Sequence, residues 1–230
     1  MLRIGVTLRN GRYIIGKILG NGGFGITYKA WDTVLNRYVA IKEFYPSGIV
    51  NRVTGTNNVM LYAAKREKEY YAQKQRFWDE AVNTKSFNQD NSKRNHNIVD
   101  VLDYFEENDT AYFVMEFLDG VPLNKYLKEK GGKLSVQEAA DIVLKIANAL
   151  ITVHEKGFVH RDISPDNIFM CKGGVVKLID FGAARFAENE DAQLSIILKP
   201  GYAPAEQYEK VNEQGPWTDI YALGATMYHL

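Results

Sequence analysis

The sequence has very little cysteine, no net charge and no long apolar run at its start. With one cysteine, Cys171, it can form no internal disulfide and lacks a Cys/His metal cluster. Lysine and arginine number 28, as do aspartate and glutamate, so no overall field favours nucleic acid or an acidic membrane surface. Neither a signal peptide nor a transmembrane span is indicated. We therefore expect a cytoplasmic protein with no nucleic-acid partner and no membrane segment in this chain.

The first half of the chain is rich in strand signals. Three stretches of β-branched and aromatic residues, separated by glycine or polar turns, predict strands at 13–19, 26–31 and 38–44. Residues 65–87 have a helical composition with a charged front. The stretches 97–107 and 110–120 predict an antiparallel pair joined around Asn108-Asp109. An irregular insertion at about 45–70, without periodicity, interrupts this half.

The second half is mainly helical. Ser135 and Glu138 form a capping-box pattern that opens an amphipathic helix running to about Lys156. Two short strands, 168–171 and 175–179, follow, and residues 219–230 predict an apolar helix without a stop signal. We expect an α+β protein divided into domains 1–118 and 119–230, with the second domain cut inside a central helix.

Four stretches carry residues suited to chemistry. The stretch GNGGFG, residues 20–25, lies between two predicted strands, so it is neither a dinucleotide fingerprint nor a P-loop; its bare backbone suits a flap over phosphates. Lys42 alternates with apolar neighbours on a strand, although a surface lysine remains an alternative. Asp180 ends an apolar strand and, with Asn167, offers oxygens to Mg²⁺. The stretch 159–169 concentrates polar groups, and a plain surface turn is its alternative reading.

Taken together and in this order, the motifs resemble the protein kinase family. They are Gly20/Gly22/Gly25, Ala40-Ile41-Lys42, His160-Arg161-Asp162 with Asn167, Asp180-Phe181-Gly182, and the helix start at Thr218-Asp219. The resemblance spans nearly the whole chain and is nearest to bacterial serine/threonine kinases of eukaryotic type. It implies a bilobal fold, with an antiparallel small lobe carrying one long helix and a mainly helical, incomplete large lobe.

The resemblance also implies roles for individual residues. Lys42 would grip the α- and β-phosphates of ATP with Glu80 as its helix partner; Glu67 and Glu69 are alternatives. Asp162 would accept the substrate's hydroxyl proton, while Asn167 and Asp180 would hold Mg²⁺. His160, Phe181 and Asp219 would be architectural. The remaining nucleotide-binding residues would be Leu19, Gly20, Gly22, Gly25, Thr27, Ala40, the gatekeeper Met115, Glu116 and Leu118.

The chain departs from the family pattern in its catalytic loop. Serine/threonine kinases carry a lysine two residues after the catalytic aspartate, where this chain has Ser164. The threonine position of the substrate loop is occupied by Lys199. We predict that Lys199 reaches back to Asp162 and the γ-phosphate, with Ser164 completing the hydrogen bonds. The alternative is a solvated Lys199 in a weakened enzyme.

Two further departures concern the insertion and the large lobe. The insertion separates Lys42 from Glu80 by 38 residues and offers a regulatory docking surface. Glu206 normally pairs with an arginine that would lie beyond Leu230, so we expect this chain alone to be poorly stable or inactive. Ser195 lies where an activating phosphate could pair with Arg161.

The expected function is ATP- and Mg²⁺-dependent phosphorylation of serine or threonine in a protein substrate. A nucleotide-binding pseudokinase scaffold is the alternative that Ser164 favours. A small-molecule phosphotransferase is a third possibility, against which the Gly201-Tyr202 and Glu206 pattern of a protein-substrate loop argues.

Overall fold

The described residues, 1–230 without 91, 93, 187–198 and 209–213, form two units in the computed structural model. The first unit comprises Met1–Lys85 and Asp100–Phe117, and the second comprises Ser86–Val99 and Leu118–Leu230. None of the described helices is both long and apolar enough to cross a membrane.

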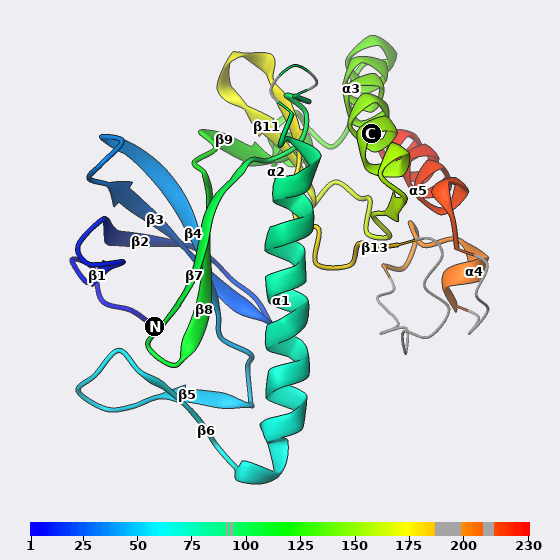
Figure 1. Cartoon of the computed structure of the whole chain (residues 1–230). Coiled ribbons are helices and arrows are strands. Elements are labelled where there is room, and N and C mark those ends of the chain that lie inside the picture. Colours follow the sequence, from blue (N-terminus) through cyan, green and yellow to red (C-terminus); the bar gives the residue numbers. More distant parts are fainter. Residues whose placement is uncertain (91, 93, 187–198, 209–213) are drawn as a thin grey trace. The chain divides into compact units, whose positions relative to one another are not determined.

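A six-stranded antiparallel sheet forms the frame of the first unit (Figure 1). In spatial order its strands are β1 (Thr7–Leu8), β2 (Tyr13–Asn21), β3 (Gly25–Asp32), β4 (Arg37–Phe44), β8 (Thr110–Glu116) and β7 (Val101–Glu107). Every second residue of β3 is buried, as a half-buried strand requires. Asn108 and Asp109 join β7 to β8 with φ of 54° and 59°, a geometry that Asn and Asp tolerate in tight hairpins. The predicted strands and this turn are therefore confirmed.

One long helix packs on this sheet. A 3₁₀ turn, Ala64–Arg66, leads into α1 (Glu67–Phe87). The Phe77 ring of α1 lies 5.4 Å from the ring of Phe44 and 4.8 Å from that of Phe113, centroid to centroid. Such tilted aromatic contacts join helix and strands in one apolar core.

The insertion is more regular than the sequence pattern predicted. Its residues form an antiparallel hairpin of β5 (Val50–Arg52) and β6 (Val59–Leu61), and Val50 and Val59 are buried in the core that includes Phe44 and Phe77. The prediction of an irregular segment was wrong because three-residue strands are too short to show a two-residue period.

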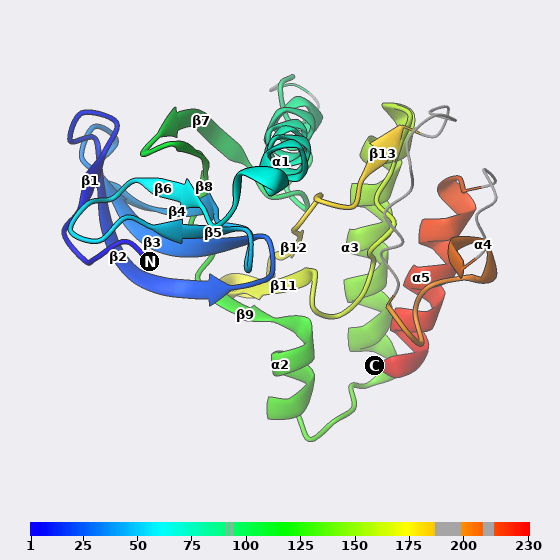
Figure 2. The ribbon, with the colours of Figure 1, turned by 90° about the horizontal axis from the view of Figure 1, so that it is seen from below.

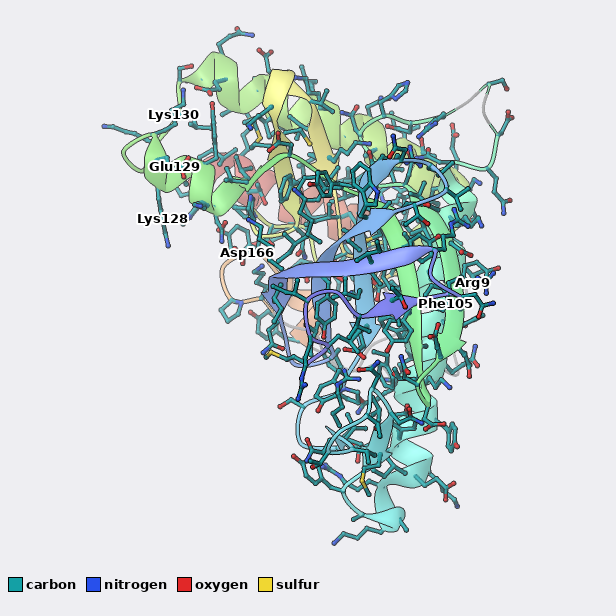
Figure 3. All side chains as sticks on the ribbon, turned by 90° about the vertical axis from the view of Figure 1, so that its left-hand side faces the viewer. Arg9, Phe105, Lys128, Glu129, Lys130 and Asp166 are labelled. Atoms are coloured by element: carbon teal, nitrogen blue, oxygen red, sulfur yellow. The ribbon has the colours of Figure 1, made fainter. Side chains whose placement is uncertain are left out.

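Arg9, in the turn after β1, contacts β7, the strand at the other end of the sheet order. The Arg9 guanidinium carbon lies 5.4 Å from the Phe105 ring centroid, and Figure 3 shows the two side chains together. The Arg9 backbone N–H also donates to Glu107 Oε2 at 2.8 Å. These contacts attach the turn after β1 to β7.

The described part of the second unit contains more helix than strand. Its helices are α2 (Leu123–Glu129), α3 (Val136–Glu155), the short α4 (Ala205–Tyr208) and α5 (Pro216–His229). Figure 2 shows α5 running beside α3. Ser135 Oγ accepts the N–H of Glu138 at 3.2 Å, so the predicted cap begins α3. The Glu138 carboxylate accepts instead from Tyr126 Oη at 2.6 Å and ties α2 to α3.

Two small antiparallel sheets complete the second unit. One has the order β12 (Val176–Leu178), β11 (Ile168–Cys171), β9 (Gly120–Pro122), and the other pairs β10 (Phe158–Val159) with β13 (Arg185–Phe186). A Cβ at Gly120 would lie 2.0 Å from the carbonyl oxygen of Met170, so only glycine permits β9 to approach β11 this closely. The predicted α+β class is confirmed: an antiparallel sheet with one long helix, and a second unit whose described part contains more helix than strand.

Two isoleucines of α3, one buried and one exposed, allow a matched pair of stability tests. Ile146 is fully buried whereas Ile151, on the same helix, is 55% exposed. We expect Ile146→Ala to lower the free energy of unfolding by about 2–5 kcal/mol, because it leaves a cavity. Ile151→Ala should stay within about 0.5 kcal/mol of the parent. Urea unfolding followed by circular dichroism measures both, and equal losses would contradict this assignment of the α3 core.

Candidate active site

The predicted site residues fall in both units. In the first unit, Lys42 on β4 donates to Glu80 on α1, with Nζ and Oε1 2.7 Å apart. Both side chains are largely buried, with 19% and 9% exposed. The structure therefore pairs Lys42 with Glu80, while Glu67 and Glu69 lie exposed at the start of α1. Glu80 follows Phe77 by three residues on the buried face of the helix, which is the signal that separated it from the other two.

The glycine-rich segment forms the turn between β2 and β3. Gly22 N–H donates to Gly25 O at 2.9 Å. A Cβ at Gly25 would lie 2.4 Å from the carbonyl oxygen of Glu43, so packing against β4 explains that glycine. At Gly20 and Gly22 a Cβ would meet nothing within 4 Å. Internal packing therefore does not require glycine at these two positions, whereas close approach of a ligand to the backbone would.

Other predicted nucleotide-binding residues of the first unit lie on its central strands. Thr27 is the register partner of Lys42, and Ala40 is that of Met115. Glu116 is held at the end of β8: its N–H donates to Asp100 O at 3.0 Å, and its Oε1 accepts the Asp100 N–H at 2.8 Å.

The two leucines of the predicted nucleotide site lie at the ends of these elements. Leu19 on β2 is 43% exposed. Leu118 is partly buried and begins the segment that belongs to the second unit.

In the second unit a buried carboxylate anchors the polar loop. Asp219 of α5, fully buried, accepts the N–H groups of His160 and Arg161 at 2.8 and 2.7 Å, and contacts His154 Nε2 at 2.8 Å. Arg161 has a φ of 70°, a conformation that this anchoring offsets. The His160 ring packs on Phe181, with centroids 4.7 Å apart.

Asp162 follows directly on this anchored segment. Its Oδ2 accepts from Asn167 Nδ2 at 2.7 Å, and the same nitrogen donates to Asp162 O at 2.8 Å. Burial raises the pKa of Asp162, while His160, Lys199 and the Asn167 hydrogen bond lower it, and Asp180 raises it. Asp162 is thus a carboxylate that is desolvated enough to gain basicity and is held in one orientation.

Asn167 and Asp180 flank the β11–β12 hairpin. Ile179 N–H donates to Asn167 O at 2.9 Å, so the two ends of the hairpin are joined next to Asp180. Both described hydrogen bonds of the Asn167 side chain use its nitrogen, which leaves the amide oxygen for a cation. Asp180, with a φ of 61°, is exposed and accepts Gly182 N–H at 3.3 Å.

These two side chains fit a magnesium ion that completes its shell elsewhere. Among the described residues, no group of three or more His, Cys, Asp or Glu side chains could hold a metal. Mg²⁺ is commonly bound by one or two protein oxygens together with substrate phosphates and water. One amide and one carboxylate oxygen are therefore a donor set suited to Mg²⁺ with a phosphate ligand.

Lys199 lies against the polar loop and contacts Ser164 and Asp166, while its predicted reach to Asp162 and to a γ-phosphate stays a prediction. Its Nζ donates to Ser164 Oγ at 2.7 Å and lies 2.5 Å from Asp166 Oδ2. Ser164 is fully buried, and 29% of the Lys199 side chain is exposed. Lys199 is therefore held by Ser164 and Asp166 rather than solvated, and its charge lowers the pKa of Asp162.

The sequence interpretation gave Asp166 no role. In the structure its carboxylate, labelled in Figure 3, accepts from Asn124 Nδ2 of α2 while contacting Lys199. Its place in the polar loop was visible in the sequence, but its pairing with a residue 33 positions later was not.

Two other predictions concern the segment after Asp180. Ser195 lies outside the described residues. Glu206, for which we expected an arginine partner, accepts Thr218 Oγ1 at 3.0 Å and so has a hydrogen-bond partner within this chain.

Comparison with known proteins gives a consistent result. The model of the protein kinase domain family matches residues 13–230. A probable serine/threonine-protein kinase of Clostridium perfringens is 32% identical over 228 residues, covering 99% of this chain and 29% of its own length. The serine/threonine-protein kinase PknA of Mycobacterium tuberculosis is 32% identical over 232 residues, covering 98% of this chain and 48% of its own length. The chain thus spans less than half of these relatives.

A solved structure, titled PpkA-294 apo form, is similar with a TM-score of 0.85 and 35% identity. The likeness covers 99% of this chain and 77% of that chain.

The effect of the Lys199 charge on Asp162 can be measured as a change in the pKa of Asp162. Because Lys199 lowers the pKa of Asp162, Lys199→Met should raise that pKa further. Lys128→Met, which removes an exposed lysine on α2, should leave the pKa unchanged. The carboxyl ¹³C shift of Asp162 followed against pH measures both variants. An unchanged or lower midpoint for Lys199→Met would contradict the contact.

Proposed function

Because the chain belongs to the protein kinase family, we propose that it transfers the γ-phosphoryl group of ATP to serine or threonine hydroxyls of proteins. The observation that carries the proposal is the half-buried Asp162 carboxylate, with a raised pKa and an orientation held by Asn167. The relatives from Clostridium and Mycobacterium are a probable and a named serine/threonine-protein kinase, which supports serine/threonine specificity. The proposal includes the cytoplasmic location that we expected from the sequence, where ATP is available as the phosphoryl donor.

In the proposed reaction Asp162 orients the substrate hydroxyl and accepts its proton as the oxygen bonds to the γ-phosphorus. The bond from that phosphorus to the β–γ bridging oxygen breaks, and ADP leaves with the electron pair. A carboxylate of raised pKa is a stronger base than an ordinary aspartate, which suits this transfer. Asn167 keeps the carboxylate facing the hydroxyl.

The remaining residues bind and neutralise the nucleotide. Lys42, held by Glu80, contacts the α- and β-phosphates, while the backbone of the glycine-rich turn covers them. Asn167 and Asp180 would hold Mg²⁺, which when bound neutralises charge on the phosphates. Ala40, Met115, Glu116 and Leu118 would surround adenine, with Leu19 and Thr27 at the edge of the nucleotide site.

Lys199 supplies the cation that Ser164 does not. The contact of Lys199 with Ser164 brings an ammonium group to the loop, and the lowering of the Asp162 pKa by this charge supports a role for Lys199 in the reaction. In the proposed reaction the ammonium group of Lys199 stabilises negative charge on the transferring phosphoryl group. Asp166 keeps the ammonium in place.

Removal of the proposed base gives the first activity test. Asp162→Asn should lower kcat by about 10²–10⁴-fold, the usual contribution of a general base, with little change in KM for ATP. Asp141→Asn on α3, an exposed aspartate, serves as the control and should retain parental turnover. Labelled ATP is offered with a generic protein substrate and with a panel of small alcohols.

The same assay separates the alternative functions. The assay is run on this chain and on a longer version of it, and nucleotide binding without transfer by both would establish a pseudokinase scaffold instead. Transfer to small alcohols alone would establish a small-molecule phosphotransferase. Turnover that is equal in the parent and in Asp162→Asn would exclude Asp162 as the base.

Removal of the proposed cation gives the second activity test. Lys199→Met should lower kcat about 10²-fold, as loss of a transition-state donor does. Lys128→Met should leave kcat unchanged. In the double variant Ser164→Lys/Lys199→Thr, which restores the usual family arrangement, kcat should exceed that of Lys199→Met. Unchanged turnover in Lys199→Met would show that the ammonium group takes no part in the reaction.

A further inference from the structure

The insertion between β4 and α1 contributes to the core of the first unit. Ile49, Val50 and Val59 are buried in the same apolar cluster as Phe44 and Phe77. Phe44 belongs to the strand that carries Lys42, and Phe77 lies three residues before Glu80 on α1. The β5–β6 hairpin therefore packs against both elements that carry the Lys42–Glu80 pair.

A buried ion pair fastens this hairpin to the sheet. Glu43, fully buried, receives Arg52 Nη2 at 2.6 and 2.8 Å on its two oxygens. The hydroxyls of Tyr28 and Tyr112 donate to the same carboxylate at 2.8 Å each. Arg52 also donates to Asn57 O inside the hairpin. A carboxylate this deeply buried requires such partners, so moving the hairpin away from the sheet would leave Glu43 buried without the charge of Arg52.

The start of the insertion is bonded to the glycine-rich turn. Tyr45 N–H donates to Phe24 O at 3.2 Å, and Ser47 N–H donates to Gly23 O at 2.9 Å. These donors lie two and four residues after Glu43. The position of the glycine-rich turn is thus linked to the segment that the ion pair holds.

The insertion is also bonded to the beginning of α1. Arg66 Nη1 donates to Gly48 O at 2.6 Å. The ring of Tyr70, one turn further, lies 5.3 Å from the Phe44 ring. Hydrogen bonds and ring contacts therefore run from the insertion along the buried face of α1 toward Glu80.

From these contacts we propose that Arg52 is a positioning residue. Acting through Glu43, it holds the insertion so that the glycine-rich turn and the Lys42–Glu80 pair keep the geometry that binds nucleotide phosphates. This inference rests on the proposed function for its link to ATP, but its structural part does not require it. The insertion acts as an internal brace, independent of any docking role.

The chain offers a matched control for Arg52. Arg12 pairs with Asp32, which is 1% exposed, at 3.0 Å between Nη2 and Oδ2. Both pairs join an arginine to a buried carboxylate on the same sheet. Asp32, however, ends β3, whereas the glycine-rich turn precedes its start at Gly25. Replacing Arg12 therefore breaks a comparable ion pair while leaving the contacts of the insertion intact.

The first measurement is amide hydrogen exchange of the protein without nucleotide. In Arg52→Gln, exchange should rise about tenfold or more at the Tyr45 and Ser47 amides and at residues 77–84 of α1. In Arg12→Gln these amides should exchange as in the parent. Comparison is made at temperatures equally far below each variant's thermal midpoint, which removes the effect of global stability. Equal protection in the two variants would overturn the proposal.

The second measurement is KM for ATP. We expect about a tenfold increase in Arg52→Gln and no more than about a twofold change in Arg12→Gln, because misplaced phosphate-binding groups weaken binding. If Arg52→Gln does not fold, the variant Glu43→Gln/Arg52→Met removes the buried charge together with its partner and should show the same two effects. Parental exchange and KM in that variant would equally overturn the proposal.

The two readouts distinguish failure of this inference from failure of the proposed function. If the parent protein neither binds nor hydrolyses ATP, the proposed function fails, and exchange still decides whether Arg52 braces the unit. If the parent turns over ATP but Arg52→Gln behaves as Arg12→Gln does, the function stands and the brace is wrong.

Discussion

A carboxylate removed from water must be surrounded by donors, and Asp219 shows how much of the second unit follows from this requirement. Its donors are the backbone N–H groups of His160 and Arg161, with His154 as a third contact. Satisfying the buried charge fixes two consecutive peptide groups and holds Arg161 in the left-handed region. Asp162, the proposed catalytic base, is the next residue, so the backbone that leads into it is held by a charge on another element.

The same constraint operates in the first unit. Glu43 is buried on β4 and takes its donors from β3, β8 and the insertion, so one side chain joins four segments. The adjacent residue, Lys42, pairs with Glu80 on α1. Successive residues of a strand point to opposite faces, so Lys42 and Glu43 place one ionic contact on each face of the sheet. An element with both faces specified in this way has little freedom to shift its register.

The polar loop has a positive charge beside it although its own residue 164 is an uncharged serine. Ser164 carries no charge, yet an ammonium group lies 2.7 Å from its hydroxyl because Lys199 approaches from a distant segment. Asp166 and Asn124 complete the surroundings of that ammonium group. Coulomb energy depends on the separation of charges in space, not along the chain, so a lysine can move in sequence while its field at Asp162 persists.

The local pattern of the sequence determined the strands, the long helices, the Ser135 cap and the order of the motifs, because periodicity and capping depend on residues within a few positions of one another. It also singled out Glu80, whose apolar neighbours mark the buried helix face. It did not predict the β5–β6 hairpin or the role of Arg52, since three-residue strands leave no period and the partner of Arg52 is buried by other segments. The contact of Asp166 with Lys199 and the bond from Thr218 to Glu206 were likewise decided only by the tertiary structure. Such pairs depend on which distant groups share a site from which water is excluded, and no local pattern carries that information.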